Sequence, residues 1–285
     1  MNILEQIIAT KRREITSAQA VKSMARIEAE ASVLTRQAVS FRKALLASPT
    51  GIIAEFKRKS PSKGFIKQEA DTAGITTSYE RAGAAAVSVL TDRDYFAGCL
   101  DDLIPARKNL SIPILRKDFI IDPYQICEAR IAGADVVLLI AAALTPANVR
   151  SLAGYAHSLG LEVLLEIHNE QELGHLCDEV DVAGINNRDL SSFRTDPARS
   201  FELGGRIPER FVKISESGLS DPRTVRQLRS AGFQGFLMGE NFMKRPDPGA
   251  ALHDFIEKLE TAQPEGPAYP LLTIESSRDR KRFTA

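Results

Sequence analysis

Residues 52–64 read IIAEFKRKSPSKG, an apolar segment that turns strongly basic after Phe56. Successive side chains in a strand point to opposite faces, so Glu55 and Lys57 would project together at the end of a strand. A carboxylate and an ammonium group inside a barrel or cleft are costly to desolvate unless they pair or bind a ligand. The segment therefore predicts a buried strand that delivers two polar side chains to a site. The alternative is a solvated strand end that carries a simple ion pair.

The same rhythm continues along the chain as short apolar runs that begin roughly 20–35 residues apart, the length of a βα unit. The runs are Ile52–Lys57, Ala86–Leu90, Ile112–Phe119, Val136–Ala141, Val163–Ile167, Val182–Asn186, Phe211–Ser215 and Gly235–Met238. Their continuous apolar character is typical of strands buried on both faces. Eight strands, each followed by a helix, predict an α/β fold, a closed (β/α)8 TIM barrel. An open doubly wound sheet is the alternative, but it usually has fewer strands, and no Gly-x-Gly-x-x-Gly turn follows the first run.

Helical patterns lie between and before these runs. Proline in the first turn predicts helix starts at Asp122-Pro123, Thr145-Pro146 and Asp221-Pro222. Glycines just past helical segments predict C-caps at Gly83, Gly133, Gly160 and Gly232. We predict an N-terminal helical extension over residues 1–47, a barrel over 48–262 that closes with an amphipathic helix, and a mobile tail over 263–285.

Composition excludes several classes of function. The chain of 285 residues carries 37 basic and 37 acidic residues, so its zero net charge predicts no nucleic-acid binding. Its longest apolar run, residues 136–144, is far shorter than the roughly 20 residues of a membrane span, so we expect no membrane partner. The N-terminal segment lacks the order of a signal peptide, and three widely spaced cysteines suit a reducing compartment. We therefore expect a cytoplasmic protein.

Polar residues gather at the predicted C-terminal strand ends, where TIM barrels build their active sites. They are Glu55, Lys57, Thr91, Asp92, Lys117, Asp118, Glu166, Asn186, Asn187, Arg188, Ser215, Glu216, Ser217, Gly218, Gly239, Glu240 and Asn241. Each alone could be a strand-end group that faces water, but together they predict a catalytic ring. Crowded or partly buried lysines can have lowered pKa values, and a desolvated glutamate can have a raised one, so we expect both near neutral pH.

Two kinds of loop are suited to contact a phosphate group. Residues 60–64, SPSKG, form a loop by composition, and their hydroxyl groups and lysine can meet an anion. Gly218 and Gly239 follow the last two strands, and the latter opens a short helical stretch, an arrangement that binds phosphate in many barrels. The alternative is that both glycines only make turns.

The sequence does not favour a metal site or a serine nucleophile. The four histidines, His157, His168, His175 and His253, share no ligand spacing, and we interpret His168, just after a strand, as structural. No Gly-x-Ser-x-Gly elbow is present.

Long motifs in this chain closely resemble those of indole-3-glycerol phosphate synthases. They are residues 53–64 (IAEFKRKSPSKG), 88–92 (SVLTD), 115–125 (LRKDFIIDPYQ), 184–190 (GINNRDL) and 215–218 (SESG), within a match from about Phe41 to Leu259. The resemblance implies a (β/α)8 barrel with a helical extension near its mouth. It also implies ring closure, decarboxylation and dehydration of a phosphorylated small molecule, 1-(2-carboxyphenylamino)-1-deoxyribulose 5-phosphate, with no metal and no organic cofactor.

The resemblance also implies roles for individual residues. Lys117 would be the general acid on the ketone oxygen, Glu166 the base or cation stabiliser in dehydration, and Lys57 the group that assists loss of hydroxide. Glu55 would orient the lysines. The other implied contacts are a pocket wall of Asn186, Arg188, Glu216 and Ser217, a phosphate site of Ser60, Gly218 and Gly239, and aromatic neighbours Phe96 and Phe119 on either side of the substrate ring.

Two other functions are compatible with the residues alone. A Schiff-base aldolase would use Lys117 to attack a carbonyl group, and a non-catalytic phosphate-binding barrel would tolerate loss of Lys117 and Glu166. Departures from the family pattern are Cys99, where serine is common, and Arg58-Lys59, where Lys-Ala is common.

Overall fold

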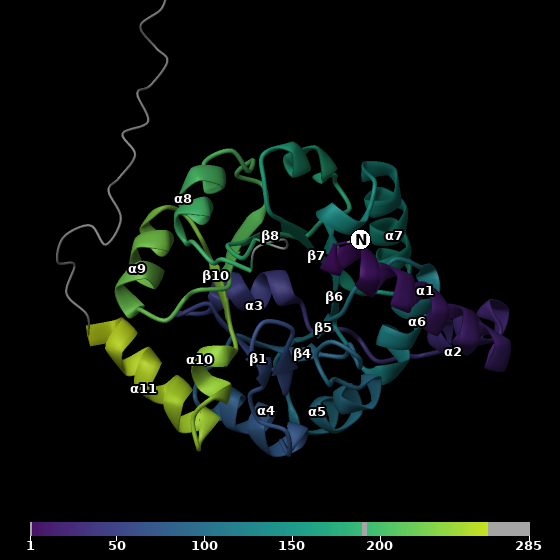
Figure 1. Ribbon diagram of the computed structural model, residues 1–285, viewed down its shortest axis with the longest axis horizontal. Helices are drawn as coiled ribbons and strands as arrows, with labels where there is room; N and C mark the ends of the chain where they lie inside the picture. Colours follow the sequence, from purple (N-terminus) through teal and green to yellow (C-terminus); the bar gives the residue numbers. More distant parts are fainter. Residues whose placement is uncertain (1, 190–192, 262–285) are drawn as a thin grey trace, which may run out of the picture.

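The computed structural model describes residues 2–189 and 193–261 and shows a closed barrel of eight parallel strands (Figure 1). The barrel strands are β1 (Ile52–Phe56), β4 (Ala86–Leu90), β5 (Ile114–Lys117), β6 (Val136–Ile140), β7 (Glu162–Ile167), β8 (Val182–Asn186), β9 (Val212–Glu216) and β10 (Gly235–Met238). Each strand pairs with its neighbours in chain order, and β10 closes the ring on β1. The predicted TIM barrel is confirmed, and all eight predicted runs contain a strand.

Helices surround the barrel in a ring (Figure 1). They are α4 (Thr72–Arg81), α5 (Leu103–Asn109), α6 (Pro123–Ala132), α7 (Pro146–Ser158), α8 (Ala198–Gly204), α9 (Pro222–Ser230), α10 (Glu240–Met243) and α11 (Pro248–Thr261), with 3-10 turns η1 (Leu100–Asp102) and η2 (Ala141–Ala143). The three predicted proline-initiated helices are confirmed, because Asp122, Thr145 and Asp221 each cap the first turn.

One local prediction is wrong, and another gains detail. Only a 3-10 turn, η3 (Gln171–His175), lies between β7 and β8, so not every strand is followed by an α-helix. The predicted SPSKG loop is the turn of a small hairpin, in which β2 (Lys59–Ser60) pairs with β3 (Gly64–Phe65). The left-handed backbone of Gly64 allows this tight reversal.

The N-terminal helices cover both ends of the barrel. α3 (Phe41–Ala47) places Phe41 and Leu45 in the core inside the barrel, and Ser40 bonds to Glu162 at the N-terminal end of β7. α1 (Ile3–Val21) lies at the opposite end, where its first turns line the mouth, and α2 (Met24–Ser32) packs on α6 (Figure 1). The extension therefore closes the barrel at the N-terminal ends of the strands and lines part of the mouth at their C-terminal ends.

No helix in residues 2–189 and 193–261 is both long enough and apolar enough to cross a membrane. The predicted tail over 263–285 lies outside the described residues.

Candidate active site

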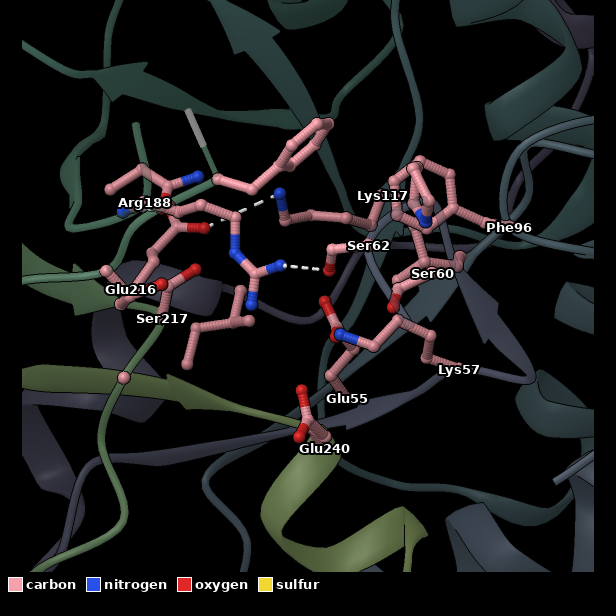
Figure 2. A pocket seen from close by; sticks show the side chains of 18 of the residues that line it. Glu55, Lys57, Ser60, Ser62, Phe96, Lys117, Arg188, Glu216, Ser217 and Glu240 are labelled. Atoms are coloured by element: carbon pink, nitrogen blue, oxygen red, sulfur yellow. Dashed lines mark hydrogen bonds and ion pairs between the residues drawn. The ribbon is translucent and has the colours of Figure 1, made fainter. Parts of the chain in front are cut away.

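A cavity of about 550 Å³ opens at the C-terminal ends of the barrel strands. The residues to which the family resemblance gives a role all line it: Glu55, Lys57, Ser60, Phe96, Lys117, Phe119, Glu166, Asn186, Arg188, Glu216, Ser217, Gly218 and Gly239. They come from seven of the eight strands or the loops that follow them (Figure 2). Four other members of the predicted polar rim do not line it: Thr91, Asp92, Asn187 and Ser215. Parallel strands in a barrel bring their carboxyl ends to one rim, so residues far apart in the chain meet there.

Lys117 lies at the centre of the charged groups. Its Nζ is 2.8 Å from Oε2 of Glu166 and 3.5 Å from Oε2 of Glu216, and both carboxylates are almost fully buried. Burial acts to lower the pKa of Lys117, but Glu166, Glu216 and Glu55 outweigh it and raise the pKa above its ordinary value. Lys117 is therefore a cation at neutral pH, and the expectation of a lowered lysine pKa is wrong for this residue.

The two carboxylates beside Lys117 differ in their protonation. Burial raises the pKa of Glu166, but Lys117 and His168 oppose it more strongly and hold the pKa well below the ordinary range. Burial raises the pKa of Glu216 to about 8, and Lys117 only partly offsets this. The glutamate with the raised pKa is thus Glu216. The pKa of Glu166 is lowered because two neighbouring cations, Lys117 and His168, stabilise its anion.

A second lysine–glutamate pair stands at the end of β1, as the alternating pattern predicts. Lys57 Nζ lies 2.5 Å from Oε1 of Glu55. Gly239 lets this pair sit close to the β10 end, because a Cβ at that position would lie 2.5 Å from Oε1 of Glu55. The pair and Lys117 face the same cavity, and their charges extend over one wall of it (Figure 2).

Other groups that line the cavity can hold an anion. Ser60 Oγ is buried without a hydrogen-bond partner, and Arg188 donates to Ser62 Oγ at 3.0 Å (Figure 2). Ser217 and Gly218 both have left-handed backbone, and a Cβ on Gly218 would lie 2.5 Å from Thr195 Cγ2. A side chain would not fit there, so the backbone itself faces the cavity.

The remaining wall is apolar and includes residues that sequence reasoning missed. The rings of Phe96 and Phe119 lie with centroids 6.1 Å apart. Ile3, Leu4 and Ile7 of α1 line the same cavity. Their helical spacing predicts an apolar face, but nothing in the sequence alone says that this face covers a site.

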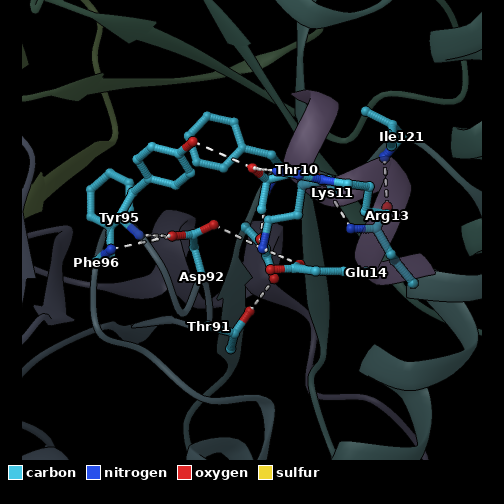
Figure 3. Close-up of polar contacts among 12 residues, drawn as sticks. Thr10, Lys11, Arg13, Glu14, Thr91, Asp92, Tyr95, Phe96 and Ile121 are labelled. Atoms are coloured by element: carbon cyan, nitrogen blue, oxygen red, sulfur yellow. Dashed lines mark hydrogen bonds and ion pairs between the residues drawn. The ribbon is translucent and has the colours of Figure 1, made fainter. Parts of the chain in front are cut away.

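A buried ionic cluster, also unpredicted, fixes α1 to the barrel (Figure 3). Lys11 Nζ lies 2.8 Å from Oδ2 of Asp92 and 3.1 Å from Oδ1 of Asp118, at the ends of β4 and β5. Asp92 also accepts hydrogen bonds from the backbone N–H groups of Tyr95 and Phe96. This cluster, Lys11, Asp92 and Asp118, holds the loop that carries Phe96 against the cavity. Asp92 and Asp118 are thus structural members of the predicted polar rim.

His168 follows β7, as the sequence indicates, but its contact with Glu166 was not predicted. Its Nε2 lies 3.2 Å from Oε1 of Glu166, on the side of that carboxylate away from Lys117. His168 does not line the cavity, so it touches the site only through Glu166.

This arrangement suits acid–base chemistry on a polar ligand with an aromatic and an anionic end. A cationic lysine can stabilise an oxygen that becomes negative, and an ionised carboxylate can stabilise a cation or take a proton. The apolar wall and the groups that can hold an anion line the same cavity as these charged side chains.

Comparison with known proteins gives consistent matches over almost the whole chain. A family model described as indole-3-glycerol phosphate synthase matches residues 4–255, which includes the N-terminal helices as well as the barrel. The indole-3-glycerol phosphate synthase of Bacteroides thetaiotaomicron is 50% identical over 259 residues, 91% of this chain and 99% of that protein. Those of a Polaromonas species and of Bordetella pertussis are each 44% identical over 257 residues, 88% of this chain and 97% of each relative.

Proposed function

This chain belongs to the indole-3-glycerol phosphate synthase family, and we propose that the cavity at the barrel mouth carries out that reaction with the side chains described above. The enzyme is a carbon–carbon lyase of tryptophan biosynthesis. It converts 1-(2-carboxyphenylamino)-1-deoxyribulose 5-phosphate to indole-3-glycerol phosphate with release of CO2 and water. The observation that carries the assignment of the site is the position of Lys117 between Glu166 and Glu216 on the cavity wall.

Ring closure is the first step. The ring carbon that bears the carboxylate attacks the ketone carbon, a carbon–carbon bond forms, and the carbonyl electron pair moves to oxygen. Lys117 stabilises that oxygen and gives it a proton. Its neighbours hold it as a cation, and an alkoxide is basic enough to take the proton even from a lysine of raised pKa.

Decarboxylation follows. The bond between the ring carbon and the carboxylate breaks, CO2 leaves, and the electron pair restores the aromatic ring. Phe96 and Phe119 contact each other, with ring centroids 6.1 Å apart, so the substrate ring would lie against this pair and not between its members. The apolar wall from α1 would exclude water from this end of the cavity. An apolar environment disfavours a carboxylate and leaves neutral CO2 unaffected, so it promotes this step.

Dehydration completes the sequence. The nitrogen lone pair expels the hydroxyl group, which leaves as water after it takes a proton from Lys57. The resulting iminium then loses a proton from the adjacent carbon. Glu166 stabilises the cation and accepts that proton, and Glu55 orients Lys57 through their 2.5 Å contact. Acid and base groups of this kind each supply about 10²–10⁴-fold in rate.

Substrate orientation requires a site for the phosphate group at the other end. Ser60 Oγ and the backbone at Gly218 and Gly239 would contact it, and Asn186, Arg188, Glu216 and Ser217 would line the space between. Asn186 accepts a hydrogen bond from the backbone N–H of Arg188 at 3.0 Å, which fixes the start of that loop.

The test is a direct assay of product. Purified enzyme and the carboxyphenylamino-deoxyribulose phosphate should give an increase in indole fluorescence, and the Lys117→Ala variant should lose it. A folded wild-type protein that binds the substrate and gives no fluorescence would contradict the proposal and leave a phosphate-binding barrel.

The same samples separate the synthase from an aldolase. Borohydride added with substrate would trap a lysine Schiff base in an aldolase, whereas the synthase forms no imine to Lys117. A covalent adduct found by mass spectrometry at Lys117 would therefore contradict the mechanism above.

We also propose that the enzyme works in the cytoplasm. Cys99, Cys127 and Cys177 are all free thiols, and the last two are buried. Unpaired buried thiols are typical of proteins that fold in a reducing compartment.

A further inference from the structure

His168 lies between two carboxylates directly behind the candidate catalytic residues. It follows β7 by one residue and is only 7% exposed. Its Nε2 is 3.2 Å from Oε1 of Glu166, and its Nδ1 is 3.3 Å from Oε2 of Glu172. The Nε2 contact has the distance of an ion pair without the alignment of a hydrogen bond. Two carboxylates this close to a buried imidazole affect whether the ring is protonated.

The second carboxylate is held firmly in place. Glu172 Oε2 accepts a hydrogen bond from the backbone N–H of His168 at 2.7 Å. Its Oε1 accepts another from the Asn169 side chain at 2.7 Å, and its own N–H donates to Asn169 Oδ1. The short η3 turn that replaces a helix after β7 brings Glu172 into this position. The imidazole is therefore fixed on one side while its other nitrogen faces Glu166.

The charges around His168 favour its protonated form. Burial lowers the pKa of His168, but the contacts with Glu166 and Glu172 outweigh it and raise the pKa to about 9. Lys117 and Glu216 lie beyond Glu166 and influence the same group of charges. Glu166 thus has a cation on each side, Lys117 toward the cavity and His168 behind it.

Glu166 would lose its ionised state during the reaction if Lys117 were its only cationic partner. It is 2% exposed, and a buried carboxylate without a cationic partner takes up a proton. Ring closure removes that partner, because Lys117 turns to the ketone oxygen and gives up its proton. A protonated Glu166 could neither stabilise the cation of the dehydration step nor accept its proton.

We propose that His168 is a positioning residue that stays charged behind Glu166 and keeps this carboxylate ionised and oriented after Lys117 has transferred its proton. This inference rests on the proposed function and deepens it, since it links the two halves of the reaction through a residue outside the cavity. The chain of ion pairs connects Glu172 to His168, His168 to Glu166, and Glu166 to Lys117.

Nuclear magnetic resonance of the imidazole nitrogens tests the charge without turnover. The chain has only four histidines, so the His168→Gln spectrum assigns the His168 signals in wild type. We expect a doubly protonated His168 ring at pH 7, with a titration midpoint above the ordinary histidine value of 6.5. In Glu172→Gln the midpoint should fall by about one unit or more, because one of the two carboxylates is gone. A neutral ring at pH 7, or a midpoint unchanged in Glu172→Gln, would overturn the proposal.

Steady-state kinetics test the role. For His168→Gln we expect kcat at pH 6–7 to fall by about 10–100-fold, with KM within twofold of wild type. Part of the lost activity should be recovered as pH rises. In the variant, Glu166 would be protonated at pH 6–7 and would become ionised at higher pH, whereas in wild type it is already ionised. The matched control is His157→Gln, which removes a histidine 2.8 Å from Asp181 at the N-terminal end of the barrel and should leave kcat unchanged.

Two results would reject the positioning role. The first is a His168→Gln enzyme with the kcat and pH profile of wild type. The second is an equal loss of activity at every pH, which a purely structural residue would give. An inactive wild-type protein would instead contradict the proposed function, whereas the nuclear magnetic resonance result bears only on His168, so the two failures are distinguishable.

Discussion

Two buried lysines at the mouth of this barrel have nearly the same surroundings and different roles. Lys11 lies between Asp92 and Asp118, and Lys117 lies between Glu166 and Glu216. Both have side chains that are mostly buried, 3% and 14% exposed, and both have pKa values raised by their carboxylates against the effect of burial. Local chemistry alone would not say which of them is catalytic.

The two lysines differ in whether every oxygen of their carboxylate partners has a hydrogen bond or an ion pair. The carboxylate oxygens around Lys11 all have a partner. Asp118 accepts from Thr91, Arg116 and the Phe119 N–H, and Asp92 Oδ1 accepts from two backbone N–H groups. Asp92 Oδ2 makes no hydrogen bond but has its 2.8 Å ion pair with Lys11. Around Lys117, Oε1 of Glu216 has no hydrogen-bond partner, and the group faces a cavity. A buried network in which every carboxylate oxygen has a hydrogen bond or an ion pair stabilises one structure, whereas a buried oxygen with neither, beside a cavity, is ready to bind a ligand.

The largest expected effect comes from the lysine beside the cavity. Lys117→Met should lower kcat by about 10³-fold, because the cation that stabilises the developing alkoxide is lost. The free energy of unfolding should change by less than ~2 kcal/mol, since His168 remains beside Glu166 and Glu216 already holds its proton at neutral pH. Stopped assays and urea denaturation measure both quantities, and a variant that keeps a tenth of wild-type activity would contradict the role of Lys117.

The matched change at the other lysine should have the opposite profile. Lys11→Met leaves Asp92 and Asp118 without their shared cation, and we expect the free energy of unfolding to fall by about 3 kcal/mol. At a temperature where the variant is folded, kcat should stay within tenfold of wild type. KM should rise, because Asp92 holds the Phe96 loop. An unfolding curve identical to that of wild type would show that the cluster does not anchor α1.

A third variant uses pH to separate the two clusters. The pKa of Glu216 is about 8 in the folded state against an ordinary value of 4.5. Below pH 4.5 the carboxyl group is protonated in both the folded and the unfolded states. As pH rises from 4.5 to 8, the unfolded state loses the proton first, so stability is lost.

Glu216→Gln should therefore be more stable than wild type by ~2 kcal/mol near pH 7, with the difference growing from pH 5 to 8. Urea denaturation at several pH values measures this difference, and the variant should also be less active. A difference in unfolding free energy that does not depend on pH would mean that Glu216 is already ionised in the folded enzyme.

The smallest expected effect connects the two clusters. Phe96→Leu should raise KM about fivefold, the equivalent of about 1 kcal/mol for one aromatic contact, with kcat within twofold of wild type. The Phe96 backbone is held by Asp92 whatever its side chain, so the unfolding free energy should change little. If KM is unchanged, the substrate ring does not lie against Phe96.

Much of the fold could be predicted from the sequence because its signals are local. Buried parallel strands require continuous apolar runs, and proline, aspartate and glycine mark helix ends within one turn. The prediction of a helix between β7 and β8 was wrong. Residues 168–181 carry no strong helical pattern, and the structure has only the η3 turn there.

The sequence by itself determined which residues reach the rim, since alternation along a strand and the common direction of parallel strands place them there. Only the tertiary structure decided which carboxylate pairs with which lysine, and hence that Glu166 is ionised and Glu216 holds its proton. It also brought Lys11 against Asp92 and Asp118, about 80 and 107 positions further along the chain. The physical reason is that pKa values and ion pairs depend on distances through space and on burial, neither of which is a property of neighbouring residues in the chain.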